Sequence, residues 1–330
     1  MTHNVVIGGG ARGLAPAAEL VARGAAVTVV DAGGPSASAG AAGMLAPAFE
    51  TVLDPASAGH GLLLRRARDL WPEFAARSGI SVHREGAEWR GPDAEGVLER
   101  LLAAGFAAGR TEAGLFTPED WRLEPKAALK ALRKTRGVAL VEDHAERIEG
   151  DRITLASGGA MNAGAVVLAG GWLSAPEGAG PLPPIRPIKG QAVRIKGPSP
   201  KRVLRGAGIY VAPTKKGAVV GATMQEGADD LEVDPDVTAT LMARAQAIWP
   251  ELASAREAEA YAGVRGASPD GLPYAGRVRD GLFCALAPRR NGWLLAPMVA
   301  RVVADAVEGR SPDPISAAMD PGRAALNPRG

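Results

Sequence analysis

Three glycines near the N-terminus have the spacing of a phosphate-binding turn. Gly8, Gly10 and Gly13 match the pattern GxGxxG. The first glycine permits a tight turn, the second lets the backbone approach a diphosphate, and the third allows a helix to pack closely on a strand. Asp31 follows the next apolar run, where its carboxylate could accept hydrogen bonds from ribose hydroxyls. The pattern predicts a dinucleotide site, but it does not distinguish FAD from NAD.

The surrounding sequence predicts the elements that such a turn needs. Residues 5–7 and 26–31 are expected to form buried strands, and Leu14–Arg23 the helix between them, as in the βαβ unit of a parallel sheet. Residues 33–46 are rich in Gly, Ala and Ser and are expected to form a loop, and Pro72 is expected either to kink a helix over 62–77 or to divide it in two. Further helices are predicted over 95–104, 125–136, 235–249 and 293–308. Further strands are predicted over 138–141, 165–169, 190–196, 208–213, 217–223, 258–265 and 282–286, with a hairpin-like stretch over 145–162.

Composition and charge narrow the class of protein. The chain has 330 residues, 46% of them hydrophobic and 22% charged, with a formal charge of +2. The two signs are interspersed, which argues against a nucleic-acid partner, and a basic run over 126–136 at helical spacing is interpreted as a solvated helix face. A single cysteine, Cys284, and four scattered histidines predict neither a disulfide nor a metal site. No apolar run approaches membrane-spanning length and no signal peptide is recognised, so a cytoplasmic location is expected.

Several blocks along the chain resemble the D-amino-acid oxidase superfamily of FAD enzymes, and within it glycine oxidases of the thiamine-pathway type. The likeness extends from Val5 to about Glu308, and the order and spacing of the blocks make it specific. The blocks are residues 41–47 (AAGMLAP), 167–172 (VLAGGW), 185–191 (IRPIKGQ), 210–213 (YVAP), 220–224 (VGATM), 263–265 (GVR), 269–271 (PDG) and 290–297 (RNGWLLAP). The resemblance implies that the dinucleotide is FAD.

The fold implied by the resemblance is an α/β protein with two parts. A Rossmann-like FAD-binding domain, expected over 1–80, 126–183 and 271–325, is interrupted by an α+β substrate domain with a mixed or antiparallel sheet, expected over 81–125 and 184–270. The proline-rich stretch 181–187 fits a crossing between the two.

The resemblance also implies which residues bind the cofactor. Besides the turn and Asp31, the matched blocks bring in contacts on both sides of the flavin, and the start of the last helix at Gly292 would face the flavin's pyrimidine end. The expected FAD contacts are Gly8, Gly10, Ala11, Arg12, Gly13, Asp31, Ala42, Gly43, Met44, Ala169, Gly170, Trp172, Asn291, Gly292, Trp293 and Leu294. Gly263 stands where covalent sarcosine oxidases carry their flavin-linking cysteine, so the FAD is expected to be non-covalent.

By the same resemblance, Arg265 would pair with the substrate carboxylate and Tyr210 would donate its hydroxyl to it. Met44 and Met224 would line the pocket, and Arg290 would lie near the flavin or the entrance. On the residues alone, the methionines could equally be core packing and either arginine could be a surface ion pair.

The implied activity is oxidation of a small amino acid, glycine first, by hydride transfer from Cα to flavin N5. The imine would be hydrolysed to the 2-oxo acid and ammonia, and O₂ would be reduced to H₂O₂. A sarcosine- or D-amino-acid-oxidising relative, a dehydrogenase, and a non-catalytic flavin-binding or tRNA-modification module remain alternatives, and a homo-oligomer is possible. The chain departs from the family's usual residues at Arg12, Pro16, Gly208 and Ala287-Pro288.

Overall fold

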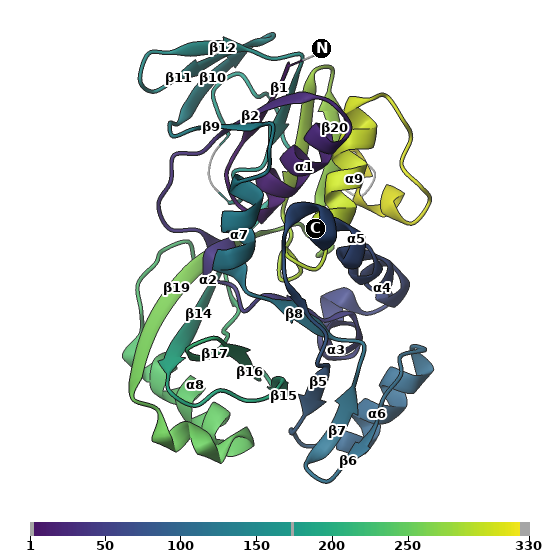
Figure 1. Cartoon of the computed structure of the whole chain (residues 1–330), viewed down its shortest axis with the longest axis vertical. Coiled ribbons are helices and arrows are strands. Elements are labelled where there is room, and N and C mark those ends of the chain that lie inside the picture. Colours follow the sequence, from purple (N-terminus) through teal and green to yellow (C-terminus); the bar gives the residue numbers. More distant parts are fainter. Residues whose placement is uncertain (1–2, 173–174, 324–330) are drawn as a thin grey trace.

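The computed structural model describes residues 3–172 and 175–323. Figure 1 shows two regions stacked along the long axis of the molecule, one around a six-stranded sheet and the other around a nine-stranded sheet. A mixed α/β fold with an interrupted Rossmann-like part is therefore confirmed. Among the described residues, no helix combines the length and the apolar character needed to cross a membrane.

The six-stranded sheet carries the glycine-rich turn. Five of its strands are parallel, and the sixth, at one edge, is antiparallel. In spatial order the strands are β20 (Tyr274–Arg279), β21 (Leu282–Leu286), β13 (Ala165–Leu168), β1 (His3–Ile7), β2 (Ala26–Val30) and β9 (Val138–Val141). Since cofactors of such sheets bind outside the carboxyl ends of the strands, this edge is where the dinucleotide is expected.

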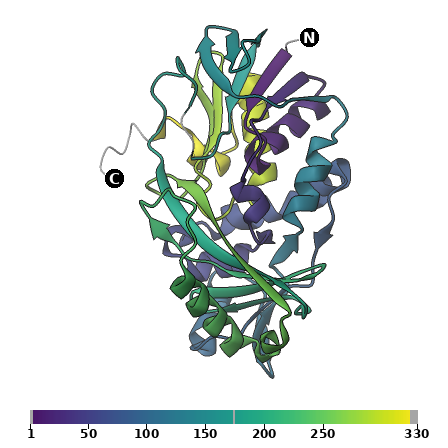
Figure 2. The same cartoon turned by 90° about the vertical axis from the view of Figure 1, so that its left-hand side faces the viewer.

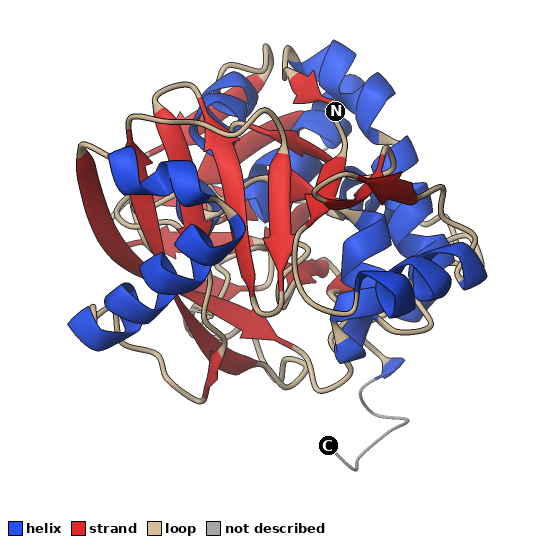
Figure 3. Ribbon diagram, turned by 90° about the horizontal axis from the view of Figure 1, so that it is seen from below, coloured by secondary structure: helices blue, strands red, loops and turns tan. Residues whose placement is uncertain are grey.

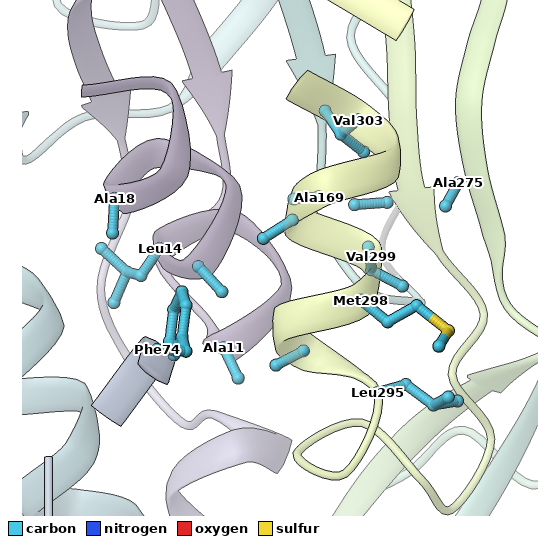
Figure 4. Packing of buried hydrophobic residues seen from close by; sticks show 14 of the residues in the cluster. Ala11, Leu14, Ala18, Phe74, Ala169, Ala275, Leu295, Met298, Val299 and Val303 are labelled. Atoms are coloured by element: carbon cyan, nitrogen blue, oxygen red, sulfur yellow. The ribbon is translucent and has the colours of Figure 1, made fainter. Parts of the chain in front are cut away.

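Both faces of this sheet are covered. Helices α1 (Ala11–Ala22) and α9 (Ala296–Val307) pack side by side on one face, where Leu14, Ala18, Val299 and Val303 are buried between them and the strands (Figure 4). Alanines dominate this contact, which lets the two helices approach each other and the sheet closely. A small sheet of β10 (Ala145–Glu149), β11 (Arg152–Leu155) and β12 (Ala160–Asn162) covers the other face. The expected hairpin over 145–162 is thus a three-stranded meander.

The nine-stranded sheet is almost wholly antiparallel, with one parallel pair between β15 and β5. Helix α8 (Pro235–Ile248) lies across it and closes an apolar core, as the view from below shows (Figure 3). The strands in order are β18 (Gln225–Glu226), β14 (Arg186–Lys196), β17 (Gly217–Gly221), β16 (Ile209–Thr214), β15 (Val203–Gly206), β5 (Ala87–Trp89), β7 (Gly114–Thr117) and β6 (Gly109–Thr111), while β19 (Glu257–Ala267) pairs with β14. The long ribbon of β14 and β19 runs from the first region into the second (Figure 2).

Short elements connect the two sheets. A three-stranded sheet contains β3 (Met44–Leu45), β8 (Trp121–Leu123) and β4 (Val82–His83). The remaining helices are α2 (Ala37–Gly40), α3 (Pro47–Leu53), α4 (Gly61–Asp69), α5 (Trp71–Ser78), α6 (Ala94–Ala103) and α7 (Pro125–Arg133), with 3₁₀ turns at Pro55–Ser57, Pro250–Ser254 and Ser316–Met319.

Two boundaries test the sequence predictions directly. Of the two outcomes expected for the helix over 62–77, division is observed, because α4 ends at Asp69 and α5 begins at Trp71 with Pro72 in its first turn, where a proline lacks only an unneeded N–H. The expected start of the last helix near Gly292 is wrong: α9 begins at Ala296. Residues 292–295 form turns, and Pro297 is tolerated because it falls in the first turn of the helix.

Candidate active site

The glycine-rich turn joins β1 to α1, and two of its glycines are required by close contacts. Gly8 has φ +116°, and a Cβ there would lie 2.5 Å from the carbonyl oxygen of Ala169. A Cβ on Gly13 would overlap the carbonyl oxygen of Gly8. Gly10 is less crowded, since its nearest neighbour would be Ser38 Oγ at 3.1 Å. The first and third glycines therefore form the turn, and the middle one keeps the surface above it low enough for a ligand.

Ser38 lies at the N-terminus of α1 and was not predicted. Its Oγ accepts a hydrogen bond from Ala11 N at 3.1 Å, and its carbonyl accepts one from Trp293 Nε1 at 3.0 Å. Ser38 belongs to α2, within the segment that was expected to be a loop. Because Ser38 Oγ accepts this bond, its own hydroxyl proton stays available to donate to a phosphate oxygen at the start of the helix.

Asp31 lies beside the turn, as expected, and it has a partner that was not. Asp31 Oδ1 accepts a hydrogen bond from Gly9 N at 3.1 Å, and Oδ2 pairs with Arg133 at the end of α7. Arg133 belongs to the basic run over 126–136, which the sequence predicts to be a solvated helix face. Its pairing shows that this face reaches the dinucleotide edge of the sheet.

The other expected cofactor contacts lie in three segments. Ala169 follows directly after β13, and its N–H donates to Ile7 O at 2.8 Å. A Cβ at Gly170 would have no atom within 4 Å, and Trp172 is half-buried. Gly43 has φ +75° and leads into β3, beside the half-buried Ala42 and Met44. Trp293 and Leu294 are buried, so these two would reach a cofactor mainly through backbone atoms.

The segment before Asn291 has an unusual backbone. Ala287 and Arg289 both have left-handed φ values, +53° and +49°, which side chains other than glycine rarely adopt. Ala287 is one of the positions at which the chain departs from the family that it resembles, and a glycine would adopt this φ without strain. Arg289 pairs with buried Asp54, and Asn291 Nδ2 lies 3.4 Å from Ser57 Oγ. The 3₁₀ turn at Pro55–Ser57 thereby supports this strained segment.

Arg265, on β19, is the expected substrate cation, and it has no acidic partner among the described residues. Its Nη1 lies 3.5 Å from the carbonyl oxygen of Thr223 and 3.7 Å from Met224 Sδ. The guanidinium lies across Gly190 of β14, where any Cβ would overlap it. Burial lowers the pKa of Arg265, and the nearby Arg290 adds to the effect. A half-buried cation without an acidic partner is expected to attract an anionic ligand.

Tyr210 accompanies Arg265. It lies on β16 opposite Gly221, whose missing side chain leaves room for the phenol oxygen. Burial raises the pKa of Tyr210 although Arg265, Arg290 and Arg205 all oppose that rise, so the three cations lie close to its hydroxyl. The hydroxyl is therefore protonated at neutral pH and can donate a hydrogen bond.

Arg290 is brought to the same place but is already paired. Its Nη2 lies 3.1 Å from Glu50 Oε1, and Arg205 Nη2 lies 2.9 Å from the same oxygen. Burial alone would raise the pKa of Glu50, but Arg290 and Arg205 together hold it below its usual range. Arg205 Nη1 also lies 3.4 Å from Met44 Sδ, which places Met44 beside this cluster. Glu50 and Arg205 were not predicted, because neither belongs to a motif that names a role.

The residues present fit a bound dinucleotide. A Cβ at Gly10 would have only Ser38 within 4 Å and a Cβ at Gly170 would have no neighbour, so the backbone at both positions is open to a ligand. No group of three or more potential metal ligands occurs in the described part of the chain.

A family model described as FAD dependent oxidoreductase (DAO) matches residues 4–306. The chain belongs to this family. Membership makes it an FAD-dependent oxidoreductase, with FAD as its cofactor.

Relatives of the chain agree with this assignment. Glycine oxidase of Pseudomonas aeruginosa is 30% identical over 93% of this chain and 95% of its own length. The bifunctional protein ThiO/ThiG of Trichormus variabilis is 31% identical over 96% of this chain, which spans about half (54%) of that relative. The crystal structure of glycine oxidase from Geobacillus kaustophilus superposes with a TM-score of 0.83 at 27% identity, covering 98% of this chain and 99% of that one.

Proposed function

We propose that this FAD enzyme oxidises the amine of a small amino acid, with glycine as the first candidate. The observation that carries the proposal is the half-buried guanidinium of Arg265, which has no carboxylate partner in the described chain and lies near the hydroxyl of Tyr210. The names of the relatives, glycine oxidase and ThiO, support the same substrate class and a role in thiamine biosynthesis.

Arg265 and Tyr210 together would bind the substrate carboxylate. A guanidinium can donate two parallel hydrogen bonds to a carboxylate and keeps its charge when buried, and the tyrosine hydroxyl adds a third donor. Holding the carboxylate fixes the Cα of an amino acid at a set distance from Arg265. Arg290 is less suited to binding the carboxylate, because it already forms an ion pair with Glu50.

The two methionines beside these arginines favour a substrate with a short side chain. Met224 Sδ lies 3.7 Å from Arg265 Nη1, and Met44 Sδ lies 3.4 Å from Arg205 Nη1. Methionine fills irregular space with apolar atoms, so a large substrate side chain would have to displace one of the two.

The chain's own residues supply orientation rather than acid–base catalysis. Glu50 is held ionised by Arg290 and Arg205, which makes it a weak base for a substrate ammonium group. The described hydrogen bonds and ion pairs of Arg265, Arg290 and Arg205 involve no histidine. When bound, FAD supplies the acceptor for the hydride from Cα and passes two electrons to O₂, so that amino acid, water and O₂ yield 2-oxo acid, ammonia and H₂O₂.

The test is an anaerobic screen of the FAD-loaded protein. Glycine, sarcosine and D-alanine are compared with glycinamide, which keeps the amine and Cα of glycine but has no carboxylate. We expect glycine to bleach the flavin absorbance and glycinamide to leave it unchanged. Admission of O₂ should then release one H₂O₂ per flavin, whereas a dehydrogenase would stay reduced. Bleaching by sarcosine or D-alanine but not by glycine would move the assignment to those substrates, and no bleaching by any amino acid would end the proposal.

A further inference from the structure

Two methionine sulfur atoms lie against arginine side chains, and the two arginines differ in their partners. Met224 Sδ lies 3.7 Å from Arg265 Nη1, and Met44 Sδ lies 3.4 Å from Arg205 Nη1. Arg205 pairs with Glu50, whereas Arg265 has no acidic partner in the described chain. A new hydrogen-bond acceptor on Met224 would therefore meet a guanidinium for which no carboxylate of the described chain competes.

Oxidation of a methionine creates such an acceptor. A thioether is a weak acceptor, and transfer of one oxygen atom from H₂O₂ to the sulfur lone pair gives a polar sulfoxide and water. The O–O bond breaks, and the sulfur loses the two electrons that the peroxide gains. The proposed oxidase activity supplies this H₂O₂ as its own product. Met224 is only half-buried, unlike Met298 and Met319 in the core, so peroxide can reach it.

The sulfoxide oxygen would lie beside the donors that a substrate carboxylate needs. The neighbouring carbonyl oxygen of Thr223 already lies 3.5 Å from Arg265 Nη1, so oxygen atoms of this segment can reach the guanidinium. We propose that Met224 is a modification site, at which oxidation by H₂O₂ blocks carboxylate binding because the sulfoxide oxygen accepts hydrogen bonds from Arg265. The inference rests on the proposed function, which supplies both the peroxide and the role of Arg265.

The first test adds H₂O₂ to the FAD-loaded protein and needs no turnover. Peptide mass spectrometry should show an added oxygen on Met224 before Met242, which is also half-buried but packs against the core of the nine-stranded sheet. Calorimetry with acetate, a carboxylate without an amine, should then give a dissociation constant about 10- to 100-fold higher, the range for loss of a hydrogen bond to a charged group. Methionine sulfoxide reductase should restore the original value.

Two substitutions separate the added oxygen from the loss of the thioether. Met224→Gln carries a carbonyl oxygen near the position of the sulfoxide oxygen, so without peroxide it should bind acetate about 10-fold or more weakly than Met224→Leu does. The dissociation constant of Met224→Leu should change by less than about twofold on peroxide treatment. Met242→Leu is the matched control, and peroxide should weaken its acetate binding as much as that of the wild type.

The outcomes distinguish the role of Met224 from the proposed function. Oxidation of Met242 while Met224 stays intact would overturn the proposal, and so would unchanged acetate binding after Met224 is oxidised. Equal dissociation constants for Met224→Gln and Met224→Leu would also overturn it. An untreated wild-type protein that binds no acetate would instead contradict the proposed role of Arg265, and with it the function on which the role of Met224 rests.

Discussion

At the scale of single residues, the arginines near Glu50 differ in whether they have an acidic partner, and this difference indicates their roles. Arg205 and Arg290 share one oxygen of the buried Glu50, which makes the three residues a structural triad. Arg265 lies near the triad without an acid of its own in the described chain, and is left for a ligand. The same residue type thus has two kinds of partner: Glu50 for Arg205 and Arg290, and for Arg265 the proposed substrate carboxylate.

The triad predicts a large loss of stability when its acid is neutralised. Glu50→Gln removes the negative charge shared by the buried Arg205 and the half-buried Arg290, and we expect the free energy of unfolding to fall by about 3 kcal/mol in urea titrations. Glu259→Gln, whose partner Arg194 lies 3.3 Å away in an exposed pair, should change it by less than about 1 kcal/mol. In a double-mutant cycle, Arg205→Met should recover part of the loss caused by Glu50→Gln. A loss below about 1 kcal/mol for Glu50→Gln would contradict the triad.

The sequence could predict the residues that belong to short local patterns, and it could not predict their partners. Gly8, Gly13 and Asp31 were found because their roles follow from spacing within one βαβ unit. Glu50 and Arg205 lie far apart in the chain, and no local pattern distinguishes a buried glutamate from a solvated one. The Arg133–Asp31 pair was missed for the same reason, since helical spacing says which residues share a face but not what that face meets.

At the scale of elements, α3 is the piece that carries Glu50 into the site, and it is capped by a distant residue. Asp120 lies just before β8 and accepts hydrogen bonds from Ala48 N at 2.8 Å and Phe49 N at 3.1 Å, both in the first turn of α3. It therefore supplies a cap that the helix's own N-cap, Ala46, cannot. A substitution that removes the hydrogen bonds between Asp120 and α3 should therefore also displace Glu50 on that helix.

This cap predicts a pH dependence of stability with a definite sign. Burial raises the pKa of Asp120 to about 7, against the opposing pull of the two amides. Because the folded pKa lies above that of an unfolded Asp, about 4, the contribution is fully present below pH 4 and is lost as pH rises toward 7. The free energy of unfolding of wild type minus that of Asp120→Asn should therefore fall across this range, by at most about 1.4 kcal/mol per pH unit. A difference that rises with pH would contradict the raised pKa.

Among the elements, those with strong periodicity were predicted well and those defined by tertiary contacts were not. The division of the helix at Pro72 follows from proline chemistry alone. Helix α2 was expected to be a loop because its Gly, Ala and Ser residues show no apolar period; Ser38 bonded to Ala11 and Tyr261 bonded to Gly40 hold it in place. The start of α9 was placed too early because Gly292 resembles a helix start, whereas the chain forms turns until Ala296.

At the scale of the whole molecule, the chain passes from the six-stranded sheet to the nine-stranded sheet and back. The residues of the first sheet fall within the ranges proposed for the FAD-binding domain, and those of the second within the ranges proposed for the substrate domain, which supports that division. The charged cluster joins Glu50, Arg205, Arg265 and Arg290 from segments on both sides of these crossings. This charged cluster can therefore form only when the regions around both sheets are folded.

The most direct test of substrate binding removes the charge of Arg265, the proposed partner of the substrate carboxylate, and leaves FAD in place. Arg265→Met should raise the KM for glycine by about 100- to 1,000-fold, with unchanged FAD content and flavin spectrum, because the substrate carboxylate would be buried without a cation. Arg202→Met, which removes an arginine stacked on Phe116, is the matched control and should keep the wild-type KM. A KM for Arg265→Met within twofold of the wild-type value would contradict the role of Arg265 in binding the substrate.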